Sequence, residues 1–333
     1  MAMTPDITFV CCVESGSLEN YTIRMVESLR RYGGIFSNCP IIAVTPRFGL
    51  PLSRCTLNSF KKFDVIHLRS HSKSSYTWFN FLNKPLALVT AENCITTSSI
   101  AWMDSDLLIL SEPEELILSP NEDFLGFPVE FKEMGTSGLG DPYEPLWQEF
   151  CSIVGINIDD LPWIITAETR QKVRLYFNGG IFVYRRSTEF ANHYLNTCLK
   201  LLDSKVILDA EDYGLGVNEM SSIGLALVKL SISWRSLTYS HDYVMSSETH
   251  DMWYKEESLS MAKIIHYHDS MWPVFWPTLL ECLQNTHPEV KLWLESLGPM
   301  CNSSPLQYRL LNRLLKESRK LKEKTYLKRC VVV

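Results

Sequence analysis

Two aspartates at the junction of two apolar runs constrain this chain more than any other feature. Residues 98–103 lead to Asp104 and Asp106, and a second apolar run, residues 107–110, follows directly. The pattern predicts two buried strands that meet at a charged corner. Two carboxylates there repel each other unless a positive charge lies between them, and Mg²⁺ and Mn²⁺ prefer such oxygen donors. A solvated turn is the alternative interpretation of an Asp-x-Asp triplet.

Apolar segments alternate with helical patterns around this corner. A helix over residues 21–32 follows the first of the strands predicted at 7–13, 40–44, 64–68 and 124–129. This alternation predicts an α/β fold with a mostly parallel central sheet flanked by helices, whose ligand site lies beyond the carboxyl ends of the strands. Residues 130–170 are rich in Gly and Pro and are predicted to be irregular.

Composition places the chain among globular proteins. Its 333 residues, 46% hydrophobic and 21% charged, are enough to bury a large core. No apolar run approaches the roughly 18 residues of a spanning helix, and the N-terminus lacks a signal-peptide pattern. The ten Cys are scattered without a CxxC pair. Free thiols and a cytoplasmic location are therefore expected.

The net charge of −6 does not reveal that the C-terminal segment is strongly basic. Residues 305–330 carry nine Lys and Arg against two Glu, which leaves 23 basic and 36 acidic residues elsewhere. Leu306, Leu310 and Leu314 recur there at helical spacing, so a basic amphipathic helix is predicted. It either packs on the core or makes peripheral contact with the inner membrane surface, which would suit a lipid-linked acceptor. Because the body is acidic, nucleic acid is not expected as a partner.

The corner also carries a family resemblance. Residues 102–108, Trp-Met-Asp-Ser-Asp-Leu-Leu, resemble the DxD motif of GT-A glycosyltransferases, and further segments are similar to the glycogenin-like family. The likeness implies a GT-A domain over 5–280 and a C-terminal helical extension over 281–333. It further implies a retaining, hexosyltransferase-type enzyme that moves a sugar from a nucleotide-diphosphate donor, UDP-linked, to an unidentified hydroxyl. In that family the DxD carboxylates hold Mn²⁺ or Mg²⁺, so Asp104 and Asp106 are expected metal ligands, with Asp104 also beside the nucleotide.

Two segments before the corner supply further donor-binding candidates. In glycogenin-like enzymes the loop after the first strand touches the base and ribose, which places Glu14 and Tyr21 beside the nucleotide. A plain surface loop is the alternative. Residues 80–88 resemble the helix that precedes the DxD strand, where Lys84 would bind the donor and reach a phosphate. A solvated lysine beside Pro85 would need no such role.

A second motif follows the corner by some 70 residues. Residues 177–180, Phe-Asn-Gly-Gly, resemble the Phe-Asn-x-Gly segment that implies donor-sugar binding by Asn178, Gly179 and Gly180. Small residues let the backbone approach the sugar closely. Because Asn-Gly is a common turn pair, a turn before a strand is the alternative.

Residues 208–215 contain the predicted catalytic pair. Glu211 and Asp212 stand where family members carry an Asp-Gln pair, so the resemblance implies that they lie near the anomeric carbon. A carboxylate there could stabilise an oxocarbenium-like state or attack it. The alternative is a helix N-terminus with favourable acidic residues.

A third motif begins at His266. It resembles the family's His-(Tyr/Phe)-x-Gly-x-x-Lys-Pro-Trp, which implies that His266 is the third metal ligand, with His268 in reserve on the same face of a strand. A structural histidine is the alternative. Asp269 stands near the Gly position and the motif's Lys is missing, so Lys263 or a residue elsewhere would have to contact the diphosphate.

Two other function classes stay open. A sugar-phosphate nucleotidyltransferase shares Asp-rich metal sites on a related sheet, but the Gly-rich basic loop that it requires after the first strand is missing. A non-catalytic protein that binds nucleotide sugar is consistent with the altered third motif.

Overall fold

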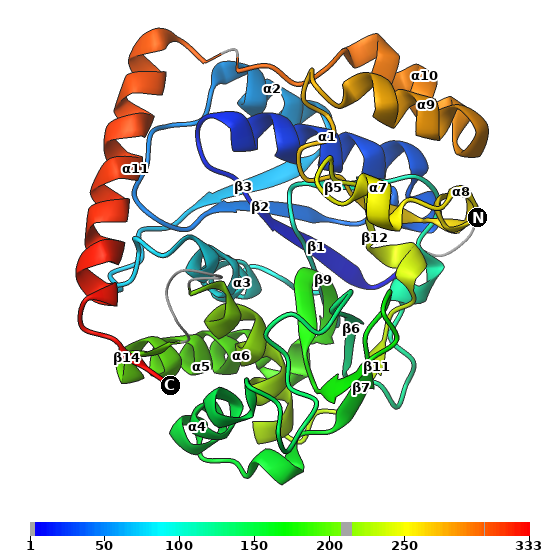
Figure 1. Cartoon of the computed structure of the whole chain (residues 1–333). Helices are drawn as coiled ribbons and strands as arrows, with labels where there is room; N and C mark the ends of the chain where they lie inside the picture. The colour runs from blue at the N-terminus through cyan, green and yellow to red at the C-terminus, as the bar shows by residue number, and fades with distance from the viewer. Residues whose placement is uncertain (1–3, 208–214, 303) are drawn as a thin grey trace.

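The computed structural model describes residues 4–207, 215–302 and 304–333 and has a seven-stranded sheet at its centre (Figure 1). The strand order is β11-β6-β9-β4-β1-β2-β3. Only β9 runs antiparallel to its neighbours, β4 and β6. The strands are β1 (Ile7–Cys12), β2 (Ile41–Thr45), β3 (Val65–Arg69), β4 (Ser99–Met103), β6 (Phe124–Pro128), β9 (Phe177–Arg185) and β11 (Trp234–Ser236). The predicted mostly parallel sheet is confirmed.

Helices cover both faces of this sheet, which explains why β1, β2, β4 and β6 are buried along their whole length. Successive side chains of a strand point to opposite faces. Phe9 of β1 packs in one core with residues of α1 (Ser17–Tyr32) and α2 (Arg54–Lys62). Val10 packs in another core with residues of α3 (Asn83–Glu92), α5 (Phe190–Ser204) and α6 (Gly216–Lys229). The flanking helices therefore fix where the carboxyl ends of the strands lie.

A second, three-stranded sheet brings the third motif to the aspartate corner. Its order is β12-β13-β5, formed by β12 (Tyr243–Val244), β13 (Ile264–His266) and β5 (Leu107–Ile109). In the antiparallel pairing of β13 with β5, His266 lies opposite Leu107. The short helices α7 (His250–Trp253) and α8 (Glu256–Met261) connect β12 to β13. Residues about 160 positions apart in the sequence thus become neighbours.

The prediction that residues 130–170 are irregular is wrong. The segment contains helix α4 (Glu144–Val154) and strand β7 (Trp163–Ile165), which pairs with β8 (Lys172–Arg174). Pro145 lies in the first turn of α4, where a missing N–H costs nothing, and Gly155 ends it with φ 74°. The apolar residues of α4 recur at helical spacing and are buried: Leu146, Trp147, Phe150, Cys151 and Val154.

The C-terminal part is helical, as predicted. It contains α9 (Trp276–Thr286), α10 (Pro288–Leu297) and α11 (Leu306–Leu327), and residue 281, where the extension was expected to begin, lies within α9. The long helix α11 runs along one side of the body (Figure 1). Its far end is anchored by Tyr326, which packs against Trp78 and donates a hydrogen bond to the Leu202 carbonyl at 2.6 Å. Beyond it, β14 (Val331–Val332) pairs with β10 (Val206–Ile207).

The two faces of α11 differ from those of a helix packed on a core. Its half-buried side chains include the polar Asn312, Arg319 and Glu323 as well as Leu315, so its inner face is mixed. Leu306 and Leu314 on the outer side are 64% and 66% exposed. Leu306, Leu310 and Leu314 therefore do not pack on the core, although the helix itself lies against the body. None of the described helices is both long and apolar enough to span a bilayer.

Candidate functional site

Backbone hydrogen bonds bring the three sequence motifs together. The N–H of Asp104 donates to the Gly180 carbonyl at 2.8 Å, which ties the corner to the second motif on β9. The N–H of Tyr267 donates to the Asp106 carbonyl at 3.0 Å, which ties the corner to the third motif. On the other side, the Ser105 hydroxyl donates to the Cys12 carbonyl at 2.7 Å. The corner is thus held on three sides at the carboxyl end of β4.

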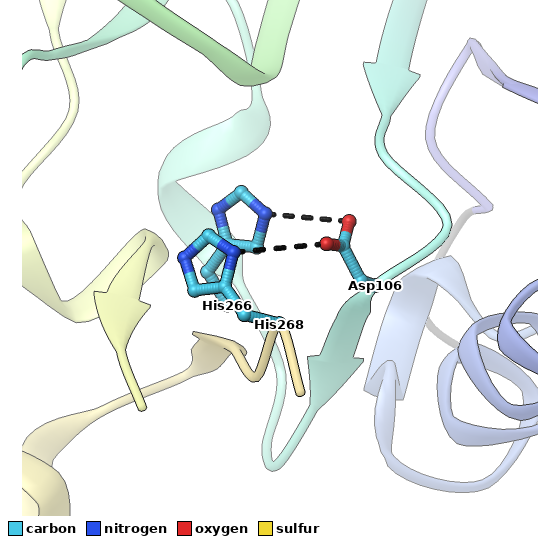
Figure 2. A group of neighbouring side chains, drawn as sticks. All are labelled: Asp106, His266 and His268. Carbon is cyan, nitrogen blue, oxygen red and sulfur yellow. Dashed lines mark ion pairs between the residues drawn. The ribbon is translucent and has the colours of Figure 1, made fainter. Parts of the chain in front are cut away.

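Asp106, His266 and His268 form a compact group of metal-ligand atoms (Figure 2). Nε2 of His266 lies 3.3 Å from Oδ1 of Asp106, and Nδ1 of His268 lies 3.8 Å from Oδ2. The three ligand atoms lie within 4.8 Å of one another. Two imidazoles and one carboxylate suit a transition-metal ion such as Mn²⁺ better than Mg²⁺, which prefers oxygen ligands. These three side chains could hold a divalent transition-metal ion, and the identity of the cofactor, Mn²⁺ or Mg²⁺, stays a prediction.

The position of His268 was predicted for the wrong reason. It was expected on the same face of a strand as His266, but β13 ends at His266. The backbone of His268 has φ 45°, in the left-handed region that a histidine rarely adopts. The turn stacks its ring on that of His266, with the ring centroids 4.0 Å apart.

Asp104 is directed toward a buried lysine rather than into the Asp106 group. Its Oδ1 accepts a hydrogen bond from the Trp102 indole N–H at 2.8 Å, and its Oδ2 lies 3.6 Å from Nζ of Lys84. Lys84 is 7% exposed, donates to the Gly179 carbonyl at 2.6 Å and lies 3.3 Å from Glu219. The alternative of a solvated Lys84 is therefore excluded.

Asn178 lies within strand β9, which excludes the alternative of a turn there. Its side-chain N–H donates to Oε1 of Glu130 at 2.9 Å, and its oxygen accepts from the N–H of Gly180 at 2.7 Å. A Cβ at Gly180 would lie only 3.0 Å from Oδ2 of Asp242 and 3.2 Å from the His266 ring. The absence of a side chain at Gly180 thus lets these polar groups converge.

Three carboxylates of this site, Glu130, Glu219 and Asp242, were not predicted from the sequence. Glu130 directly follows the strand predicted at 124–129. Its position at the carboxyl end of a predicted strand could therefore have identified it as a site residue. Asp242 is fully buried, and its Oδ1 lies 3.1 Å from Nδ1 of His266. Neither oxygen of Asp242 has a hydrogen-bond partner among the described residues. No motif marks it, because it reaches the site only through the small second sheet.

The crowded carboxylates perturb one another's protonation. Burial, together with the charge of Asp242, raises the pKa of Glu130 to about 8. Burial also raises the pKa of Asp104 to about 6, although Lys84 opposes this. Burial lowers the pKa of His266, but Asp106 and Asp242 outweigh it and hold that pKa well above its ordinary value. The His266 imidazolium thus supplies a positive charge between two carboxylates.

The predicted nucleotide contacts lie apart from each other. Glu14 accepts two hydrogen bonds from Arg47, at 2.6 and 2.7 Å. Tyr21 instead packs on the third motif, where its ring stacks on Tyr267 and its hydroxyl accepts from the Trp272 indole N–H at 2.5 Å. The structure therefore brings Glu14, but not Tyr21, to the cleft described next.

A cleft of about 570 Å³ is lined by four of the predicted site residues but not by Asn178, Gly179, Gly180 or His266. This volume is within the range of small-molecule sites, about 300–1,000 Å³. Glu14, Lys84, Asp104 and Asp106 line it, together with residues of α11. Two larger hollows, of about 690 and 640 Å³, contain none of the motif residues. The predicted catalytic pair, Glu211 and Asp212, lies outside the described residues.

Comparison with known proteins identifies the class as that of the glycosyltransferases. Residues 9–212 match the model of the Rhodobacterales glycosyltransferase domain, and the chain belongs to this family. The general prediction of a glycosyltransferase is thereby confirmed, and the observed architecture agrees with the predicted GT-A fold. Membership of the glycogenin-like family stays a prediction.

Several solved structures resemble the chain at 12% sequence identity. The match to the bifunctional glycosyltransferase WbbM extends over 88% of this chain and 52% of the WbbM chain, with a TM-score of 0.48. The match to the glycosyltransferase GlyE of Streptococcus pneumoniae extends over 90% of this chain and 66% of the GlyE chain, with a TM-score of 0.47. The match to mouse xyloside xylosyltransferase 1 extends over 78% of this chain and 97% of the mouse chain, with a TM-score of 0.44. The chain thus spans about half to two thirds of the length of the first two.

One curated protein aligns over a shorter stretch. An F-box/FBD/LRR-repeat protein of Arabidopsis thaliana is 31% identical over 134 residues. The alignment covers 37% of this chain and 27% of that protein.

The buried Glu130 predicts a specific pH dependence of stability. Its folded-state pKa of about 8 lies above its ordinary value of 4.5, so the folded state holds a proton that the unfolded state releases. The free energy of unfolding should therefore fall as pH rises from about 4.5 to 8, and Glu130→Gln should make this decline shallower, because Asp104 and His266 also have raised pKa values and still contribute to it. Melting temperatures measured across this range with a chelator present would show it.

The surface residue Glu149 in α4 offers a matched control. Glu149→Gln should follow the wild-type profile, because both retain Glu130. Parallel profiles for wild type and Glu130→Gln would mean that Glu130 is not held protonated in the folded protein.

Proposed function

We propose that this protein is a metal-dependent glycosyltransferase that moves a sugar from a nucleotide-diphosphate donor, UDP-linked, to a hydroxyl acceptor. The convergence of Asp106, His266 and His268 at the carboxyl ends of the sheet strands carries the proposal. Membership of a glycosyltransferase family supports it. A hexosyl donor and retention of anomeric configuration follow from the resemblance to glycogenin-like enzymes.

Asp106 and His266 would hold the cofactor, and the position of His268 favours it as the third ligand. Because two of these donors are imidazole nitrogens, we expect Mn²⁺ to be preferred to Mg²⁺. When bound, such an ion neutralises the charge that develops on the leaving diphosphate. Asp104 was predicted both as a metal ligand and beside the nucleotide. Its pairing with Trp102 and Lys84 at the cleft favours the nucleotide role.

Asn178, Gly179, Gly180 and Lys84 would bind the donor sugar. Asn178 uses one N–H and one lone pair inside the site, which leaves its second N–H and lone pair for sugar hydroxyls. Lys84 is already paired with carboxylates. We therefore propose that it keeps Asp104 ionised and oriented while facing the donor.

Glu211 and Asp212 remain the proposed catalytic pair. They precede α6, and Glu219 in the first turn of that helix lies at Lys84 within the site. The nearby fully buried Asp242 and the Glu130 carboxyl beside Asn178 add acidic groups on the side of the second motif. A carboxylate on this face could stabilise positive charge that develops at the anomeric carbon.

Removal of a metal ligand should abolish metal-dependent turnover. We expect Asp106→Asn and His266→Ala each to lower Mn²⁺-dependent release of UDP from a UDP-sugar by at least about a hundredfold, because the leaving-group charge loses its counterion. The assay is hydrolysis of UDP-glucose, UDP-galactose and related donors with and without Mn²⁺.

The exposed residue Asp251 provides a control with the same change of charge. Asp251→Asn should retain wild-type turnover. Full Mn²⁺-dependent turnover in Asp106→Asn would contradict the assignment, and donor binding without turnover in wild type would support the non-catalytic alternative.

We also propose that α11 makes peripheral contact with the inner membrane surface. Leu306, Leu310 and Leu314 form an outward stripe that is more than half exposed. Arg309 and Arg313 lie among these leucines in the sequence, and both are exposed. An apolar stripe with basic neighbours suits a surface of anionic lipid. The ten cysteines, all free, are consistent with a reducing cytoplasm.

Vesicle sedimentation tests this contact. Wild type should bind vesicles that contain phosphatidylserine and bind weakly to phosphatidylcholine alone, and Leu310→Glu with Leu314→Glu should abolish binding. Leu139→Glu with Leu292→Glu, which changes exposed leucines elsewhere, should not. Equal sedimentation of wild type and the α11 variant would exclude membrane contact through this stripe.

A further inference from the structure

The third motif lacks the lysine that would contact the donor diphosphate. Lys263, the residue suggested in its place, is not positioned to do so. Lys263 lies 3.6 Å from Glu114 and does not line the cleft. Lys84 does line it, but its ammonium is surrounded by Asp104, Glu219 and the Gly179 carbonyl. Protein side chains that add positive charge at the phosphates, beside that of the metal ion, would therefore come from another wall of the cleft.

Helix α11 forms that wall. Asn312, Lys316, Arg319 and Lys320 all line the cleft that contains the aspartate corner. Hydrogen bonds fix the helix there. Asn312 donates to the Ser15 carbonyl at 3.1 Å, and Arg319 donates to the Phe48 carbonyl at 2.7 Å. Because Tyr326 anchors the end of α11 in the core, these lysines are held on a fixed element.

The cationic side chains of the cleft divide into paired and available groups. Arg47 is nearly buried and binds Glu14 through two nitrogens, and Arg319 lies 3.7 Å from the same carboxylate. Among the described residues, Lys316 has no carboxylate within ion-pair distance. Lys320 has only Glu317, 3.9 Å away on the exposed surface of the same helix. Within the described part of the chain, Lys316 is thus unpaired and Lys320 has one weak surface partner, so both retain charge that can attract an anion.

We propose that α11 is part of the donor site and that Lys316 and Lys320 bind the phosphates of the nucleoside diphosphate. The inference rests on the proposed function. Residues four apart on a helix lie side by side, so the two ammonium groups can contact one diphosphate. Lysine is suited to this as a compact point charge. Arg47 and Arg319 fix Glu14, which positions this loop beside the nucleotide.

Titration calorimetry with UDP, GDP and CDP in the presence of Mn²⁺ tests the proposal on the full chain. Lys316→Gln with Lys320→Gln should weaken the binding of the tightest nucleotide about tenfold or more, because two charge-assisted contacts are lost. Binding of the corresponding nucleoside, which has no phosphates, should not change. The affinity of the variant should also depend less on salt.

Lys322→Gln with Lys324→Gln removes the same charge from the same helix outside the cleft and should leave nucleotide affinity within twofold of wild type. Equal affinities for both variants and wild type would overturn the role of α11 and leave the proposed function standing. Loss of vesicle binding without loss of nucleotide affinity would also overturn it and assign the lysines to lipid headgroups. If wild type bound none of the nucleotides, the proposed function would fail and this inference with it.

Discussion

Repulsion among buried carboxylates is the constraint around which this site is organised. Five carboxylates converge where the motifs meet: Glu130, Glu219 and Asp242 are buried, and Asp104 and Asp106 are half-buried. Burying unpaired charge is costly, so each must be compensated. Lys84 lies between Asp104 and Glu219, and the His266 imidazolium lies between Asp106 and Asp242. A raised pKa keeps Glu130 protonated near neutral pH. A bound divalent cation would take over part of this compensation.

Local sequence was sufficient for the features that depend on strand ends and on helical periodicity. The apolar runs beside Asp104 predicted β4 and β5, and the repulsion between the two carboxylates predicted a cation. His266 was identified through the family resemblance of its motif. The motif at Asn178 was found because small residues and an amide follow a recognisable spacing. Residues 130–170 were mistaken for a loop because their Gly and Pro were counted as irregular structure. In the structure Pro145 and Gly155 instead mark the ends of a helix.

The remaining features depend on tertiary packing that no local pattern records. Asp242 joins the site because β12 pairs with β13, and His268 reaches Asp106 through a left-handed backbone turn. The orientation of α11 could not be predicted either, since its leucines could equally have faced the core. Instead, the side that carries Asn312 and Arg319 packs on the body, because these two side chains donate hydrogen bonds to backbone carbonyls in loops distant in sequence.

Thermal stability of the wild-type protein against a panel of nucleotides and nucleotide sugars, with and without Mn²⁺, decides whether this cleft is a metal-dependent donor site. A ligand that binds only the folded state must raise the melting temperature. We predict a rise with one UDP-sugar that requires Mn²⁺ and disappears with a chelator. A rise with Mn²⁺ alone, and none with any donor, would contradict the account, because it would leave a metal site without a nucleotide sugar.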